Sequence, residues 1–143
     1  MRYMLMIKAN EDTEAGVPPT PGQLQAMGQL MEEMAEAGVL LGGDGLQPSS
    51  KGKRIKIAGG KIVSVTDGPF TETKEVVAGY AVVQVDSYEE LERWNERFAA
   101  AQGDGECEIR PLYEASDFIS DGFTAEDAAR EDALRRQLEN QQR

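Results

Sequence analysis

The chain has 143 residues, a net charge of −11 and no histidine, a length at which one domain around a single two-layer core is the simplest expectation. The negative charge argues against nucleic acid as a partner, because phosphate binding needs clustered Lys and Arg. Without histidine the chain lacks the usual neutral-pH acid and base and the commonest transition-metal ligand, so we expect no metal and no cofactor.

The single cysteine, Cys107, excludes an internal disulfide framework and is typical of a protein in a reducing compartment. No apolar run is long enough to cross a membrane, and the chain shows no signal-peptide pattern. We therefore expect a cytoplasmic protein with no membrane partner.

The first half of the chain predicts a strand, a helix and a short second strand. Residues 2–8 are apolar on both strand faces, which favours the middle of a sheet, and residues 9–19 predict an exposed loop. Thr20-Pro21 is a cap residue followed by a helix-starting proline, and Gly38 supplies a left-handed end. The core stripe of this helix is predicted to be Leu24, Met27, Leu30, Met31 and Met34. Residues 39–41 follow as a short strand that ends in a glycine-rich bend.

The second half predicts a hairpin, a long strand, a helix and a last strand. Residues 53–58 and 61–66 form the hairpin over Gly59-Gly60, with a basic outer face, and residues 76–85 form the longest strand. Ser87, with Glu90 three residues later, is a capping box that begins the second helix, which ends at Gly103. The core stripe of that helix is predicted to be Leu91, Trp94, Phe98 and Ala101. Residues 107–113 form the last strand, with its proline at a sheet edge.

The composition changes from Ser116 onward, and we predict one domain over 1–118 and a charged, helical tail over 119–143. A second capping-box pattern at 124–127 predicts that the tail contains a helix. Its large apolar residues are essentially Leu134 and Leu138, which indicates a solvated, partly mobile helix that could dock weakly on a partner subunit.

Between the hairpin and the longest strand lies Asp67-Gly68-Pro69-Phe70, followed by Glu72, Lys74 and Glu75. One interpretation is structural: Asp67 caps a turn and Phe70 is an apolar plug that pins the loop to the sheet. The other is functional: a rigid turn holds two carboxylates and an ammonium at the mouth of a cleft. Turn statistics favour the structural interpretation, and both stay open.

This stretch resembles the signature of the DGPF-domain branch of the YCII-related family. Further similarities are the opening strand, Gly42-Gly43 followed by Leu46 and Pro48, Gly79-Tyr80, and residues 108–112. The resemblance covers roughly residues 1–118 and implies a dimeric α/β barrel. Wider relatives appear as enzymes that use a His-Asp pair for lyase or isomerase chemistry, a pattern from which this chain departs. DGPF relatives are commonly encoded beside sigma factors of the extracytoplasmic-function class, which suggests signalling.

The order of elements predicts a ferredoxin-like α+β fold, βαβ(ββ)βαβ, with an inserted hairpin and both helices on one face of an antiparallel sheet. The second sheet face is also apolar, and no remaining helix is apolar enough to cover it. We therefore predict a homodimer of the dimeric α/β-barrel type, packed through the sheet face.

The default ligand site in such a fold is a small cleft between the helices and the sheet. The candidate binding residues are Asp44, Phe70, Glu72, Lys74, Glu75 and Arg110. Asp67 is the first candidate for a catalytic base, which would need a raised pKa. Three hypotheses remain. The favoured one is a protein that binds an unknown small molecule or regulates; the alternatives are a weak lyase or isomerase with Asp67 or Glu75 as base, and a protein-interaction module.

Overall fold

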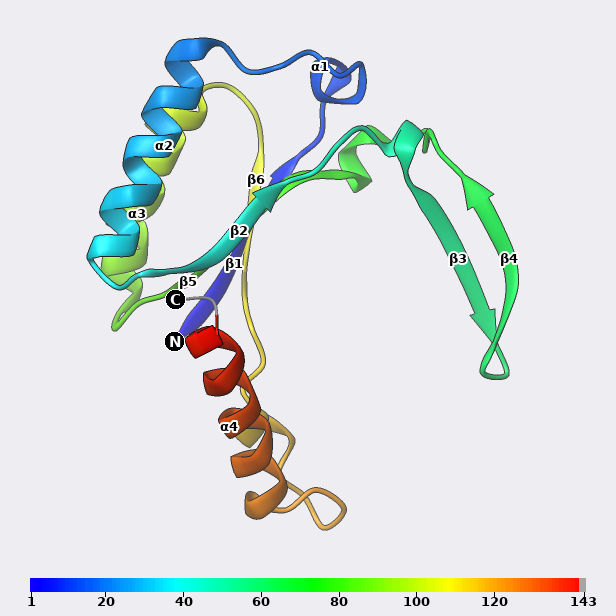
Figure 1. Cartoon of the computed structure of the whole chain (residues 1–143), viewed down its shortest axis with the longest axis vertical. Coiled ribbons are helices and arrows are strands. Elements are labelled where there is room, and N and C mark those ends of the chain that lie inside the picture. The colour runs from blue at the N-terminus through cyan, green and yellow to red at the C-terminus, as the bar shows by residue number, and fades with distance from the viewer. Residues whose placement is uncertain (142–143) are drawn as a thin grey trace. The chain divides into compact units, whose positions relative to one another are not determined.

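A computed structural model describes residues 1–141 and divides the chain into two compact units, Met1–Arg110 and a second unit that begins at Pro111. In the described part of the first unit, four strands form one antiparallel sheet in the order β2-β5-β1-β6 (Figure 1). The strands are β1 Arg2–Lys8, β2 Leu40–Gly45, β5 Val77–Gln84 and β6 Cys107–Pro111. This order and the two helices between the strands are those of a ferredoxin-like α+β fold, as the sequence predicts.

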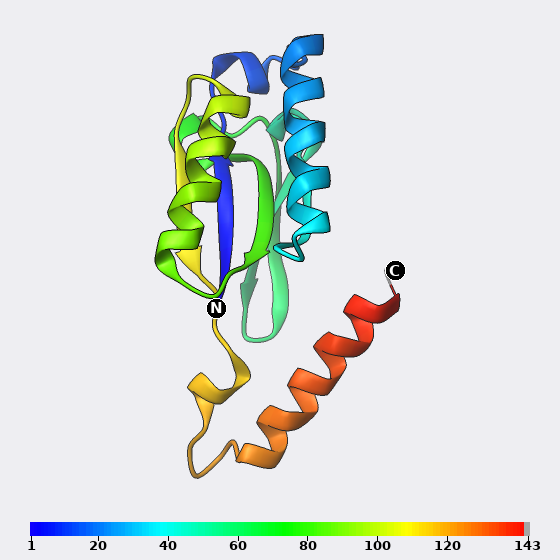
Figure 2. The same cartoon turned by 90° about the vertical axis from the view of Figure 1, so that its left-hand side faces the viewer.

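Two helices, α2 (Pro21–Glu36) and α3 (Tyr88–Gln102), lie side by side on one face of this sheet (Figure 2). The predicted helix starts are confirmed: Thr20 Oγ1 accepts from Gln23 N at 3.2 Å, and Ser87 Oγ accepts from Glu90 N at 3.1 Å. The capping box predicted at Ser87 is only half formed, because the Glu90 carboxylate accepts from Asp86 N rather than from Ser87 N. Gly38 and Gly103 follow the helix ends with φ of +73° and +79°, a region that glycine adopts readily.

The loop predicted for residues 9–19 contains a short helix, α1 (Glu11–Glu14), so this part of the prediction was wrong. The Asn10 side chain accepts from Thr13 N at 2.9 Å, and Thr13 Oγ1 accepts from Asn10 N at 2.8 Å. This reciprocal cap stabilises a single helical turn that is too short to show a periodic apolar pattern.

The core lies between the two helices and the sheet. Its buried members are Tyr3, Leu5, Leu30, Met34, Val39, Val83, Val85, Leu91 and Phe98, with Met27, Met31, Trp94 and Ala101 partly buried against them. Leu24, predicted to belong to this stripe, is instead 58% exposed, because the first turn of α2 borders a surface cleft rather than the sheet.

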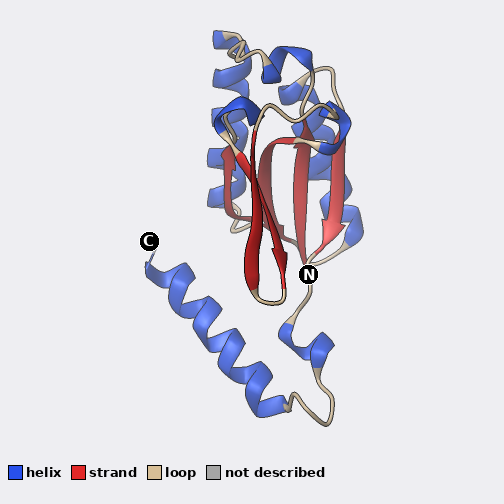
Figure 3. Cartoon of the chain, turned by 90° about the vertical axis from the view of Figure 1, so that its right-hand side faces the viewer, coloured by secondary structure: helices blue, strands red, loops and turns tan. Residues whose placement is uncertain are grey.

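The strand register explains why β1 and β5 are apolar on both faces. Tyr3 pairs with Val83 and Leu5 with Ala81, and all four are buried beneath the helices. The alternate pairs, Met4 with Val82 and Met6 with Tyr80, therefore point to the opposite face and stay partly exposed. Neither α2 nor α3 lies on that face (Figure 3).

The predicted hairpin is present as β3 (Lys53–Ala58) and β4 (Lys61–Asp67), which form a separate two-stranded sheet. Gly59 and Gly60 turn the chain with φ of +59° and +73°. The hairpin projects from the four-stranded sheet on the side away from α2 and α3 (Figure 1).

The second unit contains a short 3₁₀ turn, η3 (Ala115–Phe118), and the helix α4 (Ala125–Gln141). The predicted helix start is confirmed, because Asp127 N donates to Thr124 Oγ1 at 3.2 Å. Hydrogen bonds from the backbone and then the hydroxyl of Thr124 lower the pKa of the Asp127 carboxyl. Arg135 Nη1 lies 3.0 Å from Glu114 Oε2, which ties α4 to the turn before it. None of the described helices is long and apolar enough to cross a membrane.

Candidate functional site

The Asp67–Phe70 turn is bound to two other segments through the side chain of Ser49, in the 3₁₀ turn η1 (Ser49–Lys51). Ser49 is buried, and its Oγ accepts a hydrogen bond from Phe70 N at 3.0 Å. The same hydroxyl donates to Glu14 Oε2, and Ser49 N donates to Glu14 Oε1 at 3.0 Å. Ser49 therefore joins Glu14, 35 positions earlier in the sequence, and Phe70, 21 positions later, in one hydrogen-bond network.

This network is structural. The Ser49 hydroxyl both donates and accepts inside the protein, and it is shielded from solvent, so it is poorly placed to act as a nucleophile. The hydrogen bonds from the Ser49 hydroxyl and then its backbone N–H lower the pKa of the Glu14 carboxyl, against a smaller opposing effect of burial. Glu14 is therefore ionised at neutral pH, and its charge is stabilised by the loop it holds.

Position 68 requires glycine because the backbone of η1 passes too close for a side chain. A Cβ atom at Gly68 would lie 1.7 Å from Ser49 O, and Gly68 N donates to Gly52 O at 3.0 Å. Phe70 is half-buried, and the Arg54 guanidinium carbon lies 4.0 Å from its ring centroid, a cation–π contact. The turn therefore closes the base of the hairpin onto η1.

The predicted site residues whose side chains the structure describes are not gathered in one cleft. Asp67 ends β4 with a side chain that is 74% exposed, and it pairs with Lys53. Glu72 and Glu75 are exposed around the 3₁₀ turn η2 (Thr73–Glu75), and the side chain of Lys74 lies outside the described part of the structure. Asp44 and Arg110 are exposed on β2 and β6, the two opposite edge strands of the sheet, so they do not meet.

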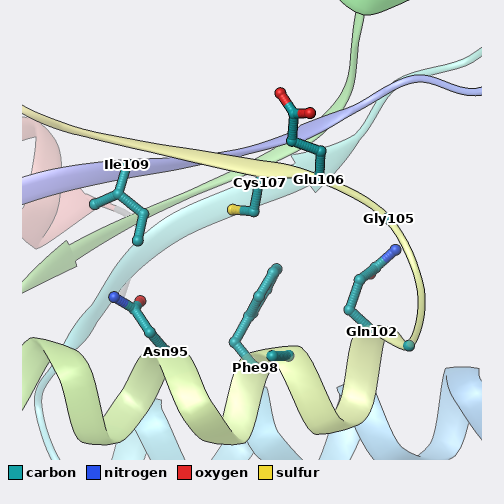
Figure 4. A pocket seen from close by; sticks show the side chains of 9 residues that line it. Asn95, Phe98, Gln102, Gly105, Glu106, Cys107 and Ile109 are labelled. Carbon is teal, nitrogen blue, oxygen red and sulfur yellow. The ribbon is translucent and has the colours of Figure 1, made fainter.

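A pocket of about 270 Å³ opens instead between the second half of α3 and β6 (Figure 4). Its walls are Asn95, Phe98, Ala99 and Gln102 from the helix, Gly103, Gly105 and Glu106 from the following loop, and Cys107 and Ile109 from the strand. The Phe98 ring rises from α3 toward Cys107, whereas the Glu106 carboxylate points away from the helix (Figure 4). Apart from Asn95, Gln102 and backbone groups, the lining is therefore mainly apolar.

Asn95 brings an unsatisfied acceptor to this pocket. Its Oδ1 is buried and, within residues 1–141, has no hydrogen-bond donor. A buried acceptor without a donor is destabilising and calls for an explanation, such as a ligand or an ordered water.

Cys107 also lines the pocket. Burial raises the pKa of the Cys107 thiol, with a smaller opposing effect of a backbone hydrogen bond at Met6, so the thiol stays neutral at physiological pH.

A second cleft, of about 390 Å³, lies between the α1–α2 loop and the loop after α3. Several of its polar groups already have partners. Asn10 and Thr13 cap each other, and Gln23 both accepts from Thr20 N and donates to Gln102 O at 3.4 Å. The α3–β6 pocket is the stronger candidate, since it alone combines apolar walls with a buried polar atom that has no partner among the described residues.

Sequence reasoning missed this pocket. Phe98 was correctly predicted to be a core residue, but Asn95 stood out in no motif, and only its burial beside β6 makes it notable. Among the described residues, no group of three or more His, Cys, Asp or Glu is placed to hold a metal ion.

Comparison with known proteins places the chain in a family. A family model described as the YCII-related domain matches residues 1–116. No curated protein matches the sequence. Among solved structures, 5-chloro-2-hydroxyhydroquinone dehydrochlorinase from Burkholderia phenoliruptrix AC1100, in complex with 2,5-dihydroxybenzoquinone, is similar over 82% of this chain and 98% of that chain, with 9% identity and a TM-score of 0.43. At that TM-score the similarity carries no information about what this chain binds.

Proposed function

The chain belongs to the YCII-related domain family, and we propose that it is a ligand-binding protein whose site is the pocket between α3 and β6. The observation that carries the proposal is the buried Asn95 Oδ1, which has no donor among the described residues and lies in a mainly apolar wall. Rotation of the Asn95 side chain, which lines the pocket, would bring this acceptor to a ligand N–H or O–H. Binding would then be favoured because a buried acceptor gains a donor.

The pocket also limits the chemistry of the ligand. A volume of about 270 Å³ suits a small molecule, and Phe98 and Ile109 offer apolar surface to an aliphatic or aromatic body. The chain has a net charge of −11, and the described lining includes no Lys or Arg, which disfavours anions. The expected ligand is a small, largely apolar, neutral or cationic molecule with one hydrogen-bond donor.

The proposed assembly is a homodimer through the helix-free face of the sheet. Met4, Met6, Tyr80 and Val82 supply apolar surface there that stays partly exposed in the single chain. Burying this surface against a second copy would be favourable. Membership of the DGPF branch, and a regulatory role linked to sigma factors, are proposals that rest on the resemblance of the Asp67–Glu75 stretch.

The alternative functions stay predictions. No geometry of the described residues favours a lyase or isomerase with Asp67 or Glu75 as base, since both are exposed and Asp67 pairs with Lys53. The interaction-module hypothesis also stays a prediction, and in the tail the helix α4 has Ala128 as its buried residue among those described.

Matched small probes test the proposal. Phenol and toluene have similar shapes, but phenol alone offers a donor for Asn95 Oδ1. We expect the wild type to bind phenol at least about tenfold more tightly than toluene, as measured by ligand-observed NMR, since one satisfied buried acceptor is worth about 1–3 kcal/mol. Asn95→Leu, which keeps similar volume without the acceptor, is expected to abolish this preference.

Glu92→Gln, an exposed position on the same helix, is the matched control and is expected to leave both affinities unchanged. If neither probe binds, or if the preference for phenol survives in Asn95→Leu, the pocket is not the ligand site proposed here.

A further inference from the structure

The hairpin β3–β4 carries an apolar face that none of the described residues of its own chain covers. All residues of both strands are exposed, and Ile55, Ile57, Ile62, Val63 and Val65 are between 53% and 67% exposed. Isolated two-stranded hairpins are marginally stable in water, and contiguous exposed apolar surface of this kind marks an interaction site.

The register sorts the hairpin side chains by face. Ile55 pairs with Val65 and Ile57 with Ile62, so these four side chains share one face. Arg54 pairs with Thr66 and Lys56 with Ser64, which makes the opposite face polar and basic. The hairpin is therefore an amphipathic two-stranded arm. The arm has no core of its own in which its apolar face could be buried.

The charge of the hairpin identifies the kind of partner. Residues 53–67 hold four of the 15 basic residues and one of the 26 acidic ones, so the hairpin carries +3 and the rest of the chain −14. A surface that attracts the hairpin is acidic and has an apolar patch. A second copy of this chain is acidic overall outside its own hairpin, and its helix-free sheet face presents an apolar patch that includes Met4, Met6 and Val82.

The position of the hairpin fits the same partner. It projects on the side of the sheet that α2 and α3 leave free, which is the side of the proposed dimer interface (Figures 1 and 3). We propose that the apolar face of the hairpin packs against a second copy of the chain, as an arm that extends the sheet-to-sheet interface. A two-fold dimer makes this contact twice, once with each arm. The inference rests on the proposed homodimer and adds a separate contact to it.

Sedimentation equilibrium of matched variants tests the arm. Ile55→Ser with Val65→Ser removes the apolar pair, and we expect the dimer dissociation constant to rise at least about 100-fold, because symmetry removes four buried side chains. Ser64→Ala with Thr66→Ser changes the opposite face of β4 and is expected to alter the constant less than about threefold. The urea midpoint of the first variant is expected to stay unchanged, measured at a concentration where both proteins are monomeric, since neither side chain belongs to the core.

A third variant separates the arm from the sheet face. Val82→Arg places a charge on the helix-free face and is expected to yield a monomer. A wild type that is monomeric at micromolar concentration would overturn both the homodimer and the arm. A dimer that Val82→Arg disrupts, and that Ile55→Ser with Val65→Ser leaves intact, would overturn the arm alone.

Photo-crosslinking identifies what the arm touches. With benzoylphenylalanine at position 57 and a mixture of isotopically light and heavy protein, we expect cross-linked peptides that join one copy to the other. Cross-links confined to a single copy would overturn the inference. Binding of a short DNA duplex at physiological salt that Lys56→Gln abolishes would assign the hairpin to nucleic acid, and would also overturn it.

Discussion

Replacing Ser49 with alanine removes the link between the Asp67–Phe70 turn, η1 and α1. The Ser49 hydroxyl accepts from Phe70 N at 3.0 Å and donates to Glu14 Oε2, and both contacts are lost. The Phe70 N–H then has no acceptor in a part-buried position, which costs about 1–3 kcal/mol. Water can reach the half-buried Glu14 carboxylate, which also keeps its hydrogen bond from Ser49 N. Losing the hydroxyl bond to Glu14 therefore costs less stability than losing the bond from Phe70 N. We expect Ser49→Ala to lower the free energy of unfolding by about 2 kcal/mol.

Urea unfolding and amide hydrogen exchange measure the two parts of this effect. The midpoint reports the total loss, and exchange at Phe70 N–H reports the broken bond itself, which we expect to lose protection in Ser49→Ala. Ser50→Ala is the matched control: the residue is next in the chain, lies in the same 3₁₀ turn and is exposed, so its change is expected within about 0.5 kcal/mol. A Ser49→Ala protein as stable as this control, with the Phe70 amide still protected, would refute the network.

Four further predictions concern the same unit and the tail. Gly68→Ala is expected to lower the free energy of unfolding by about 3 kcal/mol or more, because its Cβ would lie 1.7 Å from a backbone oxygen, whereas Gly45→Ala, with nothing within 4 Å, is the tolerated control in the same urea assay. The folded-state pKa of Glu14 lies below its ordinary value of 4.5, so its ionised form stabilises the protein above that pH and the contribution disappears as pH falls through the folded-state pKa. The stability gap between wild type and Glu14→Gln is therefore expected to shrink in urea titrations from about pH 7 to about pH 3, and a gap that grows would contradict the network. Asp67→Asn is expected to change the free energy of unfolding by no more than about 0.5 kcal/mol, since Asp67 pairs with an exposed lysine, Lys53; a loss above about 2 kcal/mol in the urea assay would show a stronger contact. Deleting residues 124–143 is expected to leave a cooperative thermal transition shifted by no more than a few degrees, and an insoluble product would show that part of the core was removed.

Much of the fold could be predicted from local pattern because its signals lie within a few residues of each other. Thr20-Pro21, Ser87 with Glu90, and Gly59-Gly60 each fix a helix start or a turn through contacts inside the same segment. Strands apolar on both faces indicated a sheet with two surfaces to cover, and the register of β1 with β5 confirms that arrangement. Leu24 was misplaced because helical periodicity tells which stripe is apolar but not where along the stripe the sheet ends.

The candidate site could not be predicted because it depends on contacts between distant segments. Ser49 and Glu14 are 35 residues apart, and neither stands in a recognisable motif, so their hydrogen bonds appear only in three dimensions. Asn95 is one of several polar residues on α3, and only the approach of β6 buries its oxygen. The Asp67–Phe70 signature drew attention to the right loop, whose geometry then proved to involve Gly68 and Phe70 in closing the hairpin base.

Chemical-shift mapping of phenol binding on ¹⁵N-labelled protein tests the central proposal, a small-ligand site between α3 and β6, most directly. The largest changes are expected at the Asn95 side-chain amide and at the backbone amides of residues 103–109, which line the pocket or lie within its rim. Changes that centre instead on the cleft beside Asn10 and Gln23, or on the Asp67–Glu75 loop, would place the ligand elsewhere and contradict the account.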